Sequence, residues 1–244
     1  MIGLRFGKYV TVKTLGSGAM GHVYEAVEEP MGRRVAIKVL DVGPAADSLL
    51  RARFQNEARA AAEINHPGVV TIYAVEETAA GQPYLVMELL SGETLRERMK
   101  RDGSLPWRVV LGIGRQLASA LYRAHQRGVV HRDVKPANIM LSPDPEAPGG
   151  VRVKLLDLGI AKLPPRDEPS LGHANTNVVT MGGVIIGTPG YMAPEQCRDG
   201  AQADGKADVY ALAATLFHAL TGQLVVGDPQ NRPEMQLYAH LHHE

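Results

Sequence analysis

The feature that most constrains this chain is a polar run in its middle, residues 131–138, which reads HRDVKPAN. The run holds a carboxylate that can accept a proton, Asp133, together with Lys135 and the amide Asn138. A second carboxylate follows at Asp157, and carboxylate and amide oxygens are hard ligands of the kind that Mg²⁺ prefers. Taken singly, these residues fit a loop, a turn or the end of a strand. Taken together, they favour one chemical site.

A glycine-rich segment lies near the N-terminus, where Gly16, Gly18 and Gly21 follow the spacing G-x-G-x-x-G. Without Cβ atoms, such a backbone can approach a polyphosphate closely and point amide N–H groups at it. The same spacing occurs in dinucleotide-binding turns, which open a helix. Here residues 22–27 have the pattern of a strand, so a phosphate-binding loop between two strands is favoured, and a plain hairpin is the remaining alternative.

Lys38 lies in a β-branched and aliphatic run, residues 34–40, that predicts another strand. Alternation along a strand turns Ala36 and Lys38 to the same face. A lysine that points into an apolar cleft needs anionic partners, because an unpaired buried ammonium is costly. The alternative is a surface lysine whose ammonium reaches water.

Strand and helix patterns divide the chain into a first part rich in strands and a second part rich in helices. In the first part we expect strands at 9–15, 22–27, 34–40, 69–75 and 83–88, and a helix at 47–64. In the second part we expect helices at 106–126 and 208–220, and short strands at 139–141 and 151–156. The polar segment 163–183 contains Pro and Gly and is expected to be a mobile loop.

Bulk composition adds limits on partners and location. Lys+Arg and Asp+Glu both total 26, so no net charge steers the chain toward nucleic acid or a membrane surface. Cys197 is the only cysteine, which excludes an internal disulfide and fits a reducing compartment. No apolar run approaches the roughly 20 residues of a membrane helix, and residues 1–8 lack the apolar core of a signal peptide. We therefore expect a cytoplasmic chain, and leave open an anchor beyond Glu244.

Together with the stretch 187–195 (GTPGYMAPE), these motifs resemble the catalytic domain of eukaryotic-like, Hanks-type serine/threonine protein kinases, most of all the bacterial members. The resemblance covers residues 8–244. It implies an α+β, bilobal protein-kinase-like fold, with a small antiparallel β-sheet lobe that carries one helix (1–88), a hinge (89–92) and a larger, mainly helical lobe (93–244). It also implies transfer of the γ-phosphate of Mg-ATP to serine or threonine hydroxyls of proteins in bacterial signalling.

The resemblance assigns chemical roles to the residues of the second lobe. Asp133 would accept or orient the proton of the attacking hydroxyl, and Lys135 would balance charge on the γ-phosphate. Thr188 would bridge Asp133 and Lys135, and Asn138 and Asp157 would hold Mg²⁺.

The resemblance also assigns an ATP site. Lys38 would bind the α- and β-phosphates and pair with Glu57, for which Glu63 is the rival. Met87 would stand at the back of the adenine pocket, and backbone groups of residues 88–90 would hydrogen-bond the base. The expected nucleotide-binding residues are Leu15, Gly16, Gly18, Gly21, Val23, Ala36, Lys38, Glu57, Met87, Glu88, Leu89, Leu90 and Met140.

Regulation by phosphorylation is a further implication. In related kinases the arginine equivalent to Arg132 binds a phosphorylated residue of the activation loop, whose phosphate adds about −1.5 to −2 of charge. Thr180 is the first candidate, and Thr176 and Ser170 are weaker ones. Phosphorylation of the chain's own loop implies self-association of two copies. The alternative is that Arg132 only caps a carbonyl.

The chain departs from the family pattern in two places. Leu158 replaces the usual Phe after Asp157, and an aliphatic residue can fill the same packing role. Asp208 matches the residue that accepts backbone N–H bonds beneath the catalytic loop, but the chain stops before the last helices of the family.

Two rival functions remain. One is an ATP-binding, kinase-shaped interaction module that is inactive through truncation. The other is a small-molecule phosphotransferase, which the peptide-docking character of 187–195 disfavours.

Overall fold

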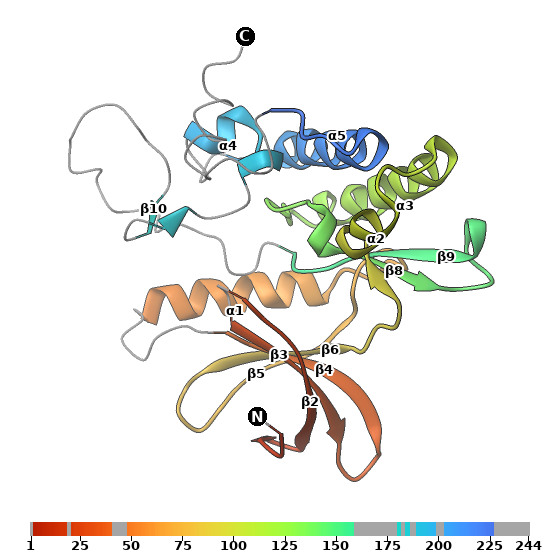
Figure 1. Ribbon diagram of the computed structural model, residues 1–244. Helices are drawn as coiled ribbons and strands as arrows, with labels where there is room; N and C mark the ends of the chain where they lie inside the picture. The colour runs from red at the N-terminus through yellow and green to blue at the C-terminus, as the bar shows by residue number, and fades with distance from the viewer. Residues whose placement is uncertain are drawn as a thin grey trace. The chain divides into compact units, whose positions relative to one another are not determined.

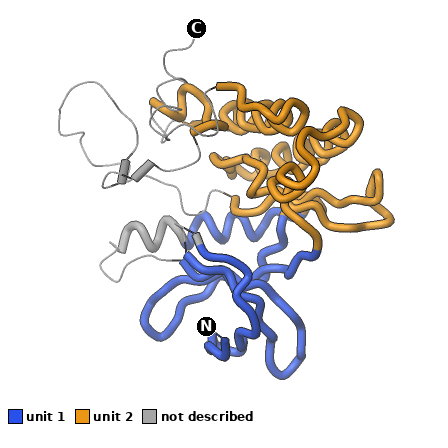
Figure 2. Tube along the Cα trace, in the orientation of Figure 1, with its two compact units in different colours: residues 1–65, 70–91 blue, residues 66–69, 92–244 orange. Residues whose placement is uncertain are grey.

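The computed structural model describes residues 2–18, 21–40, 48–158, 180–181, 184–185, 189–198 and 203–226, shown as a ribbon in Figure 1. The chain forms two compact units (Figure 2). Unit 1 comprises Met1–Asn65 and Val70–Ser91, and unit 2 comprises His66–Val69 and Gly92–Glu244. Among the described residues, no helix combines the length and the apolar character required to span a membrane.

Unit 1 is an antiparallel sheet with one helix. Its six strands have the order β1-β2-β3-β4-β6-β5, and all neighbouring pairs are antiparallel. The strands are β1 (Arg5–Phe6), β2 (Tyr9–Gly18), β3 (Gly21–Glu28), β4 (Arg33–Leu40), β5 (Ile72–Glu77) and β6 (Pro83–Glu88). The helix α1 (Ser48–Ala62) packs against β5 (Figure 1).

The two faces of this sheet differ because side chains alternate along each strand. One face carries a buried core with aromatic residues from four strands. Its members are Phe6, Tyr9, Tyr24, Ala26, Val35, Ile37, Val39, Tyr84 and Val86. The intervening residues of β3 and β4, among them Val23, Ala36 and Lys38, therefore lie on the opposite face.

Unit 2 is mainly helical and contains a small sheet in the order β7-β8-β9. Its helices are α2 (Leu95–Asp102), α3 (Trp107–His125), α4 (Pro194–Arg198) and α5 (Gly205–Thr221), with 3₁₀ helices η1 (Pro136–Asn138), η2 (Pro148–Gly150) and η3 (Pro189–Tyr191). Its strands are β7 (Glu93–Thr94), β8 (Ile139–Pro143), β9 (Val151–Leu155) and the antiparallel pair β10 (Thr180–Met181) and β11 (Val184–Ile185). Helices α3 and α5 pack together, and buried residues of both form the core.

The expected α+β class and the order of the long elements are confirmed, and the structure differs from the expectation at several short elements. Helix α2 was not predicted, because its sequence LRERMKRD is polar almost throughout. The two-residue strands β1, β7, β10 and β11 and the five-residue helix α4 were also not predicted, because such short elements carry no periodicity. The strand expected at 69–75 begins only at Ile72, because Val69 belongs to unit 2 and forms a parallel bridge with Leu155 there. Beside this bridge, Leu155 N donates to Gly68 O at 2.8 Å. Most of the segment 163–183 expected to be a loop lies outside the described residues.

Candidate active site

The polar run 131–138 lies between α3 and β8, and a buried carboxylate of α5 holds its first residues. Asp208 is fully buried. Its Oδ2 accepts a hydrogen bond from His131 N, and its Oδ1 accepts one from Arg132 N, both at 2.8 Å. The ring of His125 also contacts Oδ2 through Nε2, at 2.7 Å. The expectation that Asp208 accepts backbone N–H bonds beneath this loop is confirmed.

His131 ties the same loop to the residues just before Asp157. Its ring is fully buried. Nδ1 accepts from Asp133 N (3.2 Å), and since the Leu156 carbonyl can only accept, Nε2 carries the proton and donates to it (2.7 Å). This role was not predicted, although a histidine at the start of the run was the available signal in the sequence.

Two residues of this region have positive φ although they are not glycine. They are Arg132 (φ 61°) and Asp157 (φ 55°). Such conformations cost free energy in a residue with a Cβ and gather at functional sites. The backbone of Arg132 is held on both sides, by Asp208 at its N–H and by Gln196, whose Nε2 donates to its carbonyl at 2.7 Å. No feature of the sequence reveals these angles.

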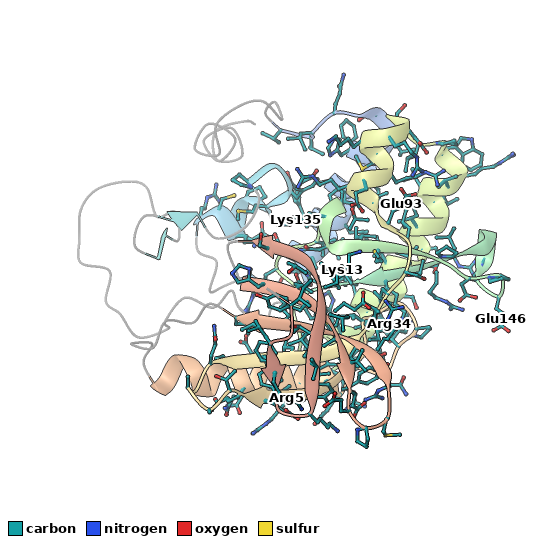
Figure 3. All side chains as sticks on the ribbon, turned by 60° about the horizontal axis from the view of Figure 1, so that its bottom comes forward. Arg5, Lys13, Arg34, Glu93, Lys135 and Glu146 are labelled. Carbon is teal, nitrogen blue, oxygen red and sulfur yellow. The ribbon has the colours of Figure 1, made fainter. Side chains whose placement is uncertain are left out.

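The carboxylate of Asp133 is held by two donors from its own loop. Asn138 Nδ2 donates to Asp133 Oδ2 at 2.7 Å and to the Asp133 carbonyl at 2.9 Å. The ammonium of Lys135, which is labelled in Figure 3, lies 2.9 Å from the same Oδ2. The side chain of Asp133 is only 6% exposed, so this acid is fixed in position and paired with a positive charge.

Asn138 and Asp157 lie at one end of the β8–β9 hairpin. Asn138 immediately precedes β8, Asp157 follows β9, and Leu156 N donates to the carbonyl of Asn138 at 2.9 Å. Because Nδ2 of Asn138 serves Asp133, its Oδ1 is the amide atom that can face a cation. An amide and a carboxylate oxygen suit Mg²⁺. The described ranges contain no cluster of three or more His, Cys, Asp or Glu side chains that could hold a metal ion. A cation bound by Asn138 and Asp157 would therefore take its further oxygen ligands from a phosphate group or from water.

In unit 1, the residues expected to contact a nucleotide gather on one face of the sheet. Antiparallel pairing places Val23 opposite Lys38 and Ala36 opposite Met87. Lys38 is only 8% exposed. Glu57 lies half-buried on α1. This face of the sheet therefore carries apolar side chains and one buried ammonium, with the Glu25–Arg34 ion pair farther along the same strands.

The end of β6 and the two residues after it, 88–90, were expected to hydrogen-bond a base through their backbone groups. The backbone N–H of Glu88 donates to Thr71 O at 3.0 Å, and the Glu88 carboxylate accepts from Thr71 N at 2.6 Å. The backbone N–H of Glu88 is thus already bonded within the protein. Leu89 and Leu90 follow outside the strand and are half-buried.

The glycine-rich segment is a β2–β3 hairpin, with Gly18 paired to Gly21 and Gly16 paired to Val23. Gly21 has φ +123°, and a Cβ there would lie 1.9 Å from the carbonyl oxygen of Val39. Only glycine fits this position. Since a strand follows the third glycine, the helix-opening dinucleotide turn does not apply here. Leu15, just before the first glycine, is 43% exposed.

Some of the remaining predicted residues lie within the described ranges, and others lie outside them. Met140 lies in β8, and Leu158 is buried at 1% exposure, in agreement with an apolar packing role. Thr188, Thr176 and Ser170 lie outside the described residues. The backbone of Thr180 pairs with Ile185 in the β10–β11 pair, and its side chain is not described.

Comparisons with known proteins agree on the family. The family model for the protein kinase domain matches residues 9–243. Serine/threonine-protein kinase PknA of Mycobacterium tuberculosis is 38% identical over 221 residues, which are 89% of this chain and 47% of PknA. Serine/threonine-protein kinase Pkn1 of Myxococcus xanthus is 41% identical over 229 residues, which are 93% of this chain and 31% of Pkn1. The chain thus spans about half or less of these relatives.

A solved structure supports the same assignment. The crystal structure of the Mycobacterium tuberculosis PknI kinase domain matches with a TM-score of 0.69 and 34% sequence identity. The match covers 96% of this chain and 80% of that one. With the family model, the bacterial relatives and this fold in agreement, the chain belongs to the protein kinase family.

Proposed function

We propose that this chain transfers the γ-phosphate of ATP to serine or threonine hydroxyls of proteins. The observation that carries the proposal is the environment of Asp133, whose Oδ2 lies 2.7 Å from Asn138 Nδ2 and 2.9 Å from Lys135 Nζ. A carboxylate fixed in this way can take the proton of an incoming hydroxyl. The neighbouring ammonium can at the same time offset negative charge on the phosphoryl group in transfer.

Asn138 and Asp157 are the proposed ligands of a divalent cation. Their positions at one end of the β8–β9 hairpin, with Leu156 N bonded to Asn138 O, support the pairing. When bound, Mg²⁺ would neutralise phosphate charge. The protein's own part is to hold the amide oxygen of Asn138 outward, since its Nδ2 is committed to Asp133.

The ATP site proposed for unit 1 is the sheet face that carries Val23, Ala36, Lys38 and Met87. The first two side chains and Met87 would contact the base, and Lys38 would bind the α- and β-phosphates with Glu57 as its partner. The β2–β3 hairpin with Gly16, Gly18 and Gly21 would cover the phosphates through its N–H groups. The other residues expected from the sequence, Leu15, Glu88, Leu89, Leu90 and Met140, belong to the same proposed set.

A phosphorylation switch at Arg132 is the regulatory part of the proposal. Arg132 Nε is buried and has no hydrogen-bond partner among the described residues. A buried donor without an acceptor is costly, and a phosphate group would supply acceptors and opposite charge. Thr180 stays the first candidate for the modified residue, and a second copy of the chain is the proposed kinase for it.

The test is mass spectrometry after incubation of the purified chain with Mg-ATP, separately with a generic protein substrate and with small-molecule acceptors such as an aminoglycoside and choline. We expect phosphate on serine and threonine of protein, and none with Asp133→Asn. Transfer only to the small molecules would overturn the proposal. ATP binding without any transfer would show a kinase-shaped binding module instead.

A further inference from the structure

A pocket of about 610 Å³ opens within unit 2, beside the loop that carries Asp133. Its walls come from α2, from residues 135–137, from η3 and from the C-terminal end of α5. Lys135 lines this pocket and also lies 2.9 Å from Asp133 Oδ2. A molecule in the pocket would therefore sit next to the proposed proton acceptor.

The described residues that line the pocket include three cations, Arg96, Lys100 and Lys135, and no acid. Helix α2 contributes Arg96, Met99 and Lys100, and its C-cap Gly103 adds to the same wall. The spacing of these residues places them on one helical face. Arg96 and Lys100 are exposed, and neither makes an ion pair or hydrogen bond through its side chain to a described residue. Lys135 adds a third positive charge, already paired with Asp133.

The other charged residues of α2 are engaged elsewhere. Arg101 binds Glu93 (Nη2 to Oε1, 3.0 Å) and Asp102 (Nε to Oδ1, 2.8 Å). Arg98 pairs with Asp102 at 2.5 Å. Glu97 accepts from Thr94 N at 2.7 Å in the capping box that begins the helix. The paired residues Arg98 and Arg101 of α2 therefore do not line the pocket, whereas the unpaired cations Arg96 and Lys100 do.

The polar side chains that η3 and α5 contribute to the pocket are uncharged at neutral pH. Tyr191 Oη and His218 Nδ1 form a hydrogen bond of 2.6 Å. Burial lowers the pKa of His218 and raises the pKa of Tyr191 to about 12, so both are neutral near pH 7. The unbalanced charge of the pocket therefore resides in Arg96 and Lys100, and an anionic side chain is the complementary occupant.

We propose that this pocket receives an aspartate or glutamate of the protein substrate, a few residues from the acceptor serine or threonine, with Arg96 and Lys100 as the specificity-determining residues. This inference rests on the proposed function, because the occupant is taken to be part of the peptide whose hydroxyl reaches Asp133. It goes beyond that function by naming the class of substrate: acidic rather than basic sequences around the acceptor.

The test is a positional scan of an alanine-based peptide with one central serine, in which Glu, Ala or Arg is placed at each flanking position in turn. We expect Glu to raise kcat/KM over Ala by roughly three- to tenfold at one position or two adjacent ones, the range for a partly exposed ion pair. Arg at the same position should lower it.

Variants assign the effect to the pocket. Lys100→Ala and Arg96→Ala should remove the preference for Glu and leave kcat/KM on the all-alanine peptide within about twofold. Arg101→Ala is the matched control, since it removes one positive charge from the next residue of the same helix, on the face paired with Glu93. The double variant Arg96→Glu/Lys100→Glu should reverse the preference from Glu to Arg, which a general structural defect would not do.

A flat scan, or a Glu preference that survives the double variant, would overturn the inference. If no peptide is phosphorylated by any form, the proposed function fails, and the pocket is then judged by binding alone. For this, the fluorescence anisotropy of a labelled Glu-containing peptide is measured without nucleotide. Equal affinity for the unaltered chain and for Arg96→Glu/Lys100→Glu, each shown to be folded by its melting curve, would reject the pocket independently.

Discussion

At the scale of single residues, the geometry of the site depends on groups that the motifs alone do not reveal. Asp133, Lys135 and Asn138 could be identified from the sequence, because a carboxylate, an ammonium and an amide at this spacing indicate a chemical site. It could not show that Arg132 and Asp157 have positive φ, since these angles result from tertiary hydrogen bonds such as that from Arg132 N to Asp208. The role of Asp208 was predictable only through the resemblance.

Asp208 gives the first prediction at this scale. Asp208→Ala leaves two buried backbone N–H groups without acceptors and should lower the free energy of unfolding by about 3 kcal/mol. Urea denaturation measures this loss. Asp208→Asn is the control, because it keeps one acceptor oxygen and should cost clearly less. Equal stability of the alanine variant and the unaltered chain would contradict the role given to this carboxylate.

Cys197 gives the second prediction at the residue scale. Burial, aided by the charge of Glu195, raises the pKa of its thiol to about 11, and its side chain is 2% exposed. Iodoacetamide should therefore label it slowly at pH 8 in the folded chain and readily in urea, because the thiolate is the reactive form. Because the pKa is raised in the folded chain, its contribution to stability is fully present below the pKa of the unfolded thiol. This contribution is lost as the pH rises from about 9 toward 11. Rapid labelling of the folded chain at pH 8, followed by mass spectrometry, would refute this account.

At the scale of elements, hydrophobic periodicity predicted the long strands and helices well and failed for short or polar ones. Helix α3 buries one face, and strand β4 buries its last six residues on both faces, so their patterns are visible in the sequence. Helix α2 has few apolar residues, and its visible signal was instead the capping box formed by Thr94 and Glu97. The break of the expected strand at 69–75 could not be predicted, because it depends on Val69 pairing with Leu155, far away in sequence.

The β2–β3 hairpin carries the prediction at this scale. Gly21→Ala forces a Cβ to within 1.9 Å of Val39 O at φ +123°, so the hairpin has to shift. We expect a loss of about 2 kcal/mol in unfolding free energy and at least roughly tenfold weaker ATP binding, measured by calorimetry. Gly16→Ala is the matched control for stability alone, since its Cβ would meet nothing within 4 Å. Equal unfolding free energies of the two variants would contradict the strain at Gly21, and an unchanged ATP affinity of Gly21→Ala would contradict a role of the hairpin in nucleotide binding.

At the scale of the whole molecule, the chain divides its chemistry between two units. Unit 1 carries the sheet face with Lys38, and unit 2 carries the loop with Asp133 and the pocket lined by Arg96 and Lys100. The sequence predicted the family and the α+β class, because motif residues and strand alternation are local properties. It did not reveal the pocket, which brings residues 96–103 together with 135–137, 190–191 and 218–224 by folding alone.

The measurement that tests the central claim most directly is the single-turnover transfer of labelled γ-phosphate to a serine peptide by the unaltered chain and by Asp133→Asn. If Asp133 takes the hydroxyl proton, the substitution should slow transfer by roughly 10²–10⁴-fold. The affinity for ATP, measured on the same samples, should stay within about twofold. A loss of less than tenfold with the protein folded and ATP bound would contradict the role of Asp133 and the account built on it.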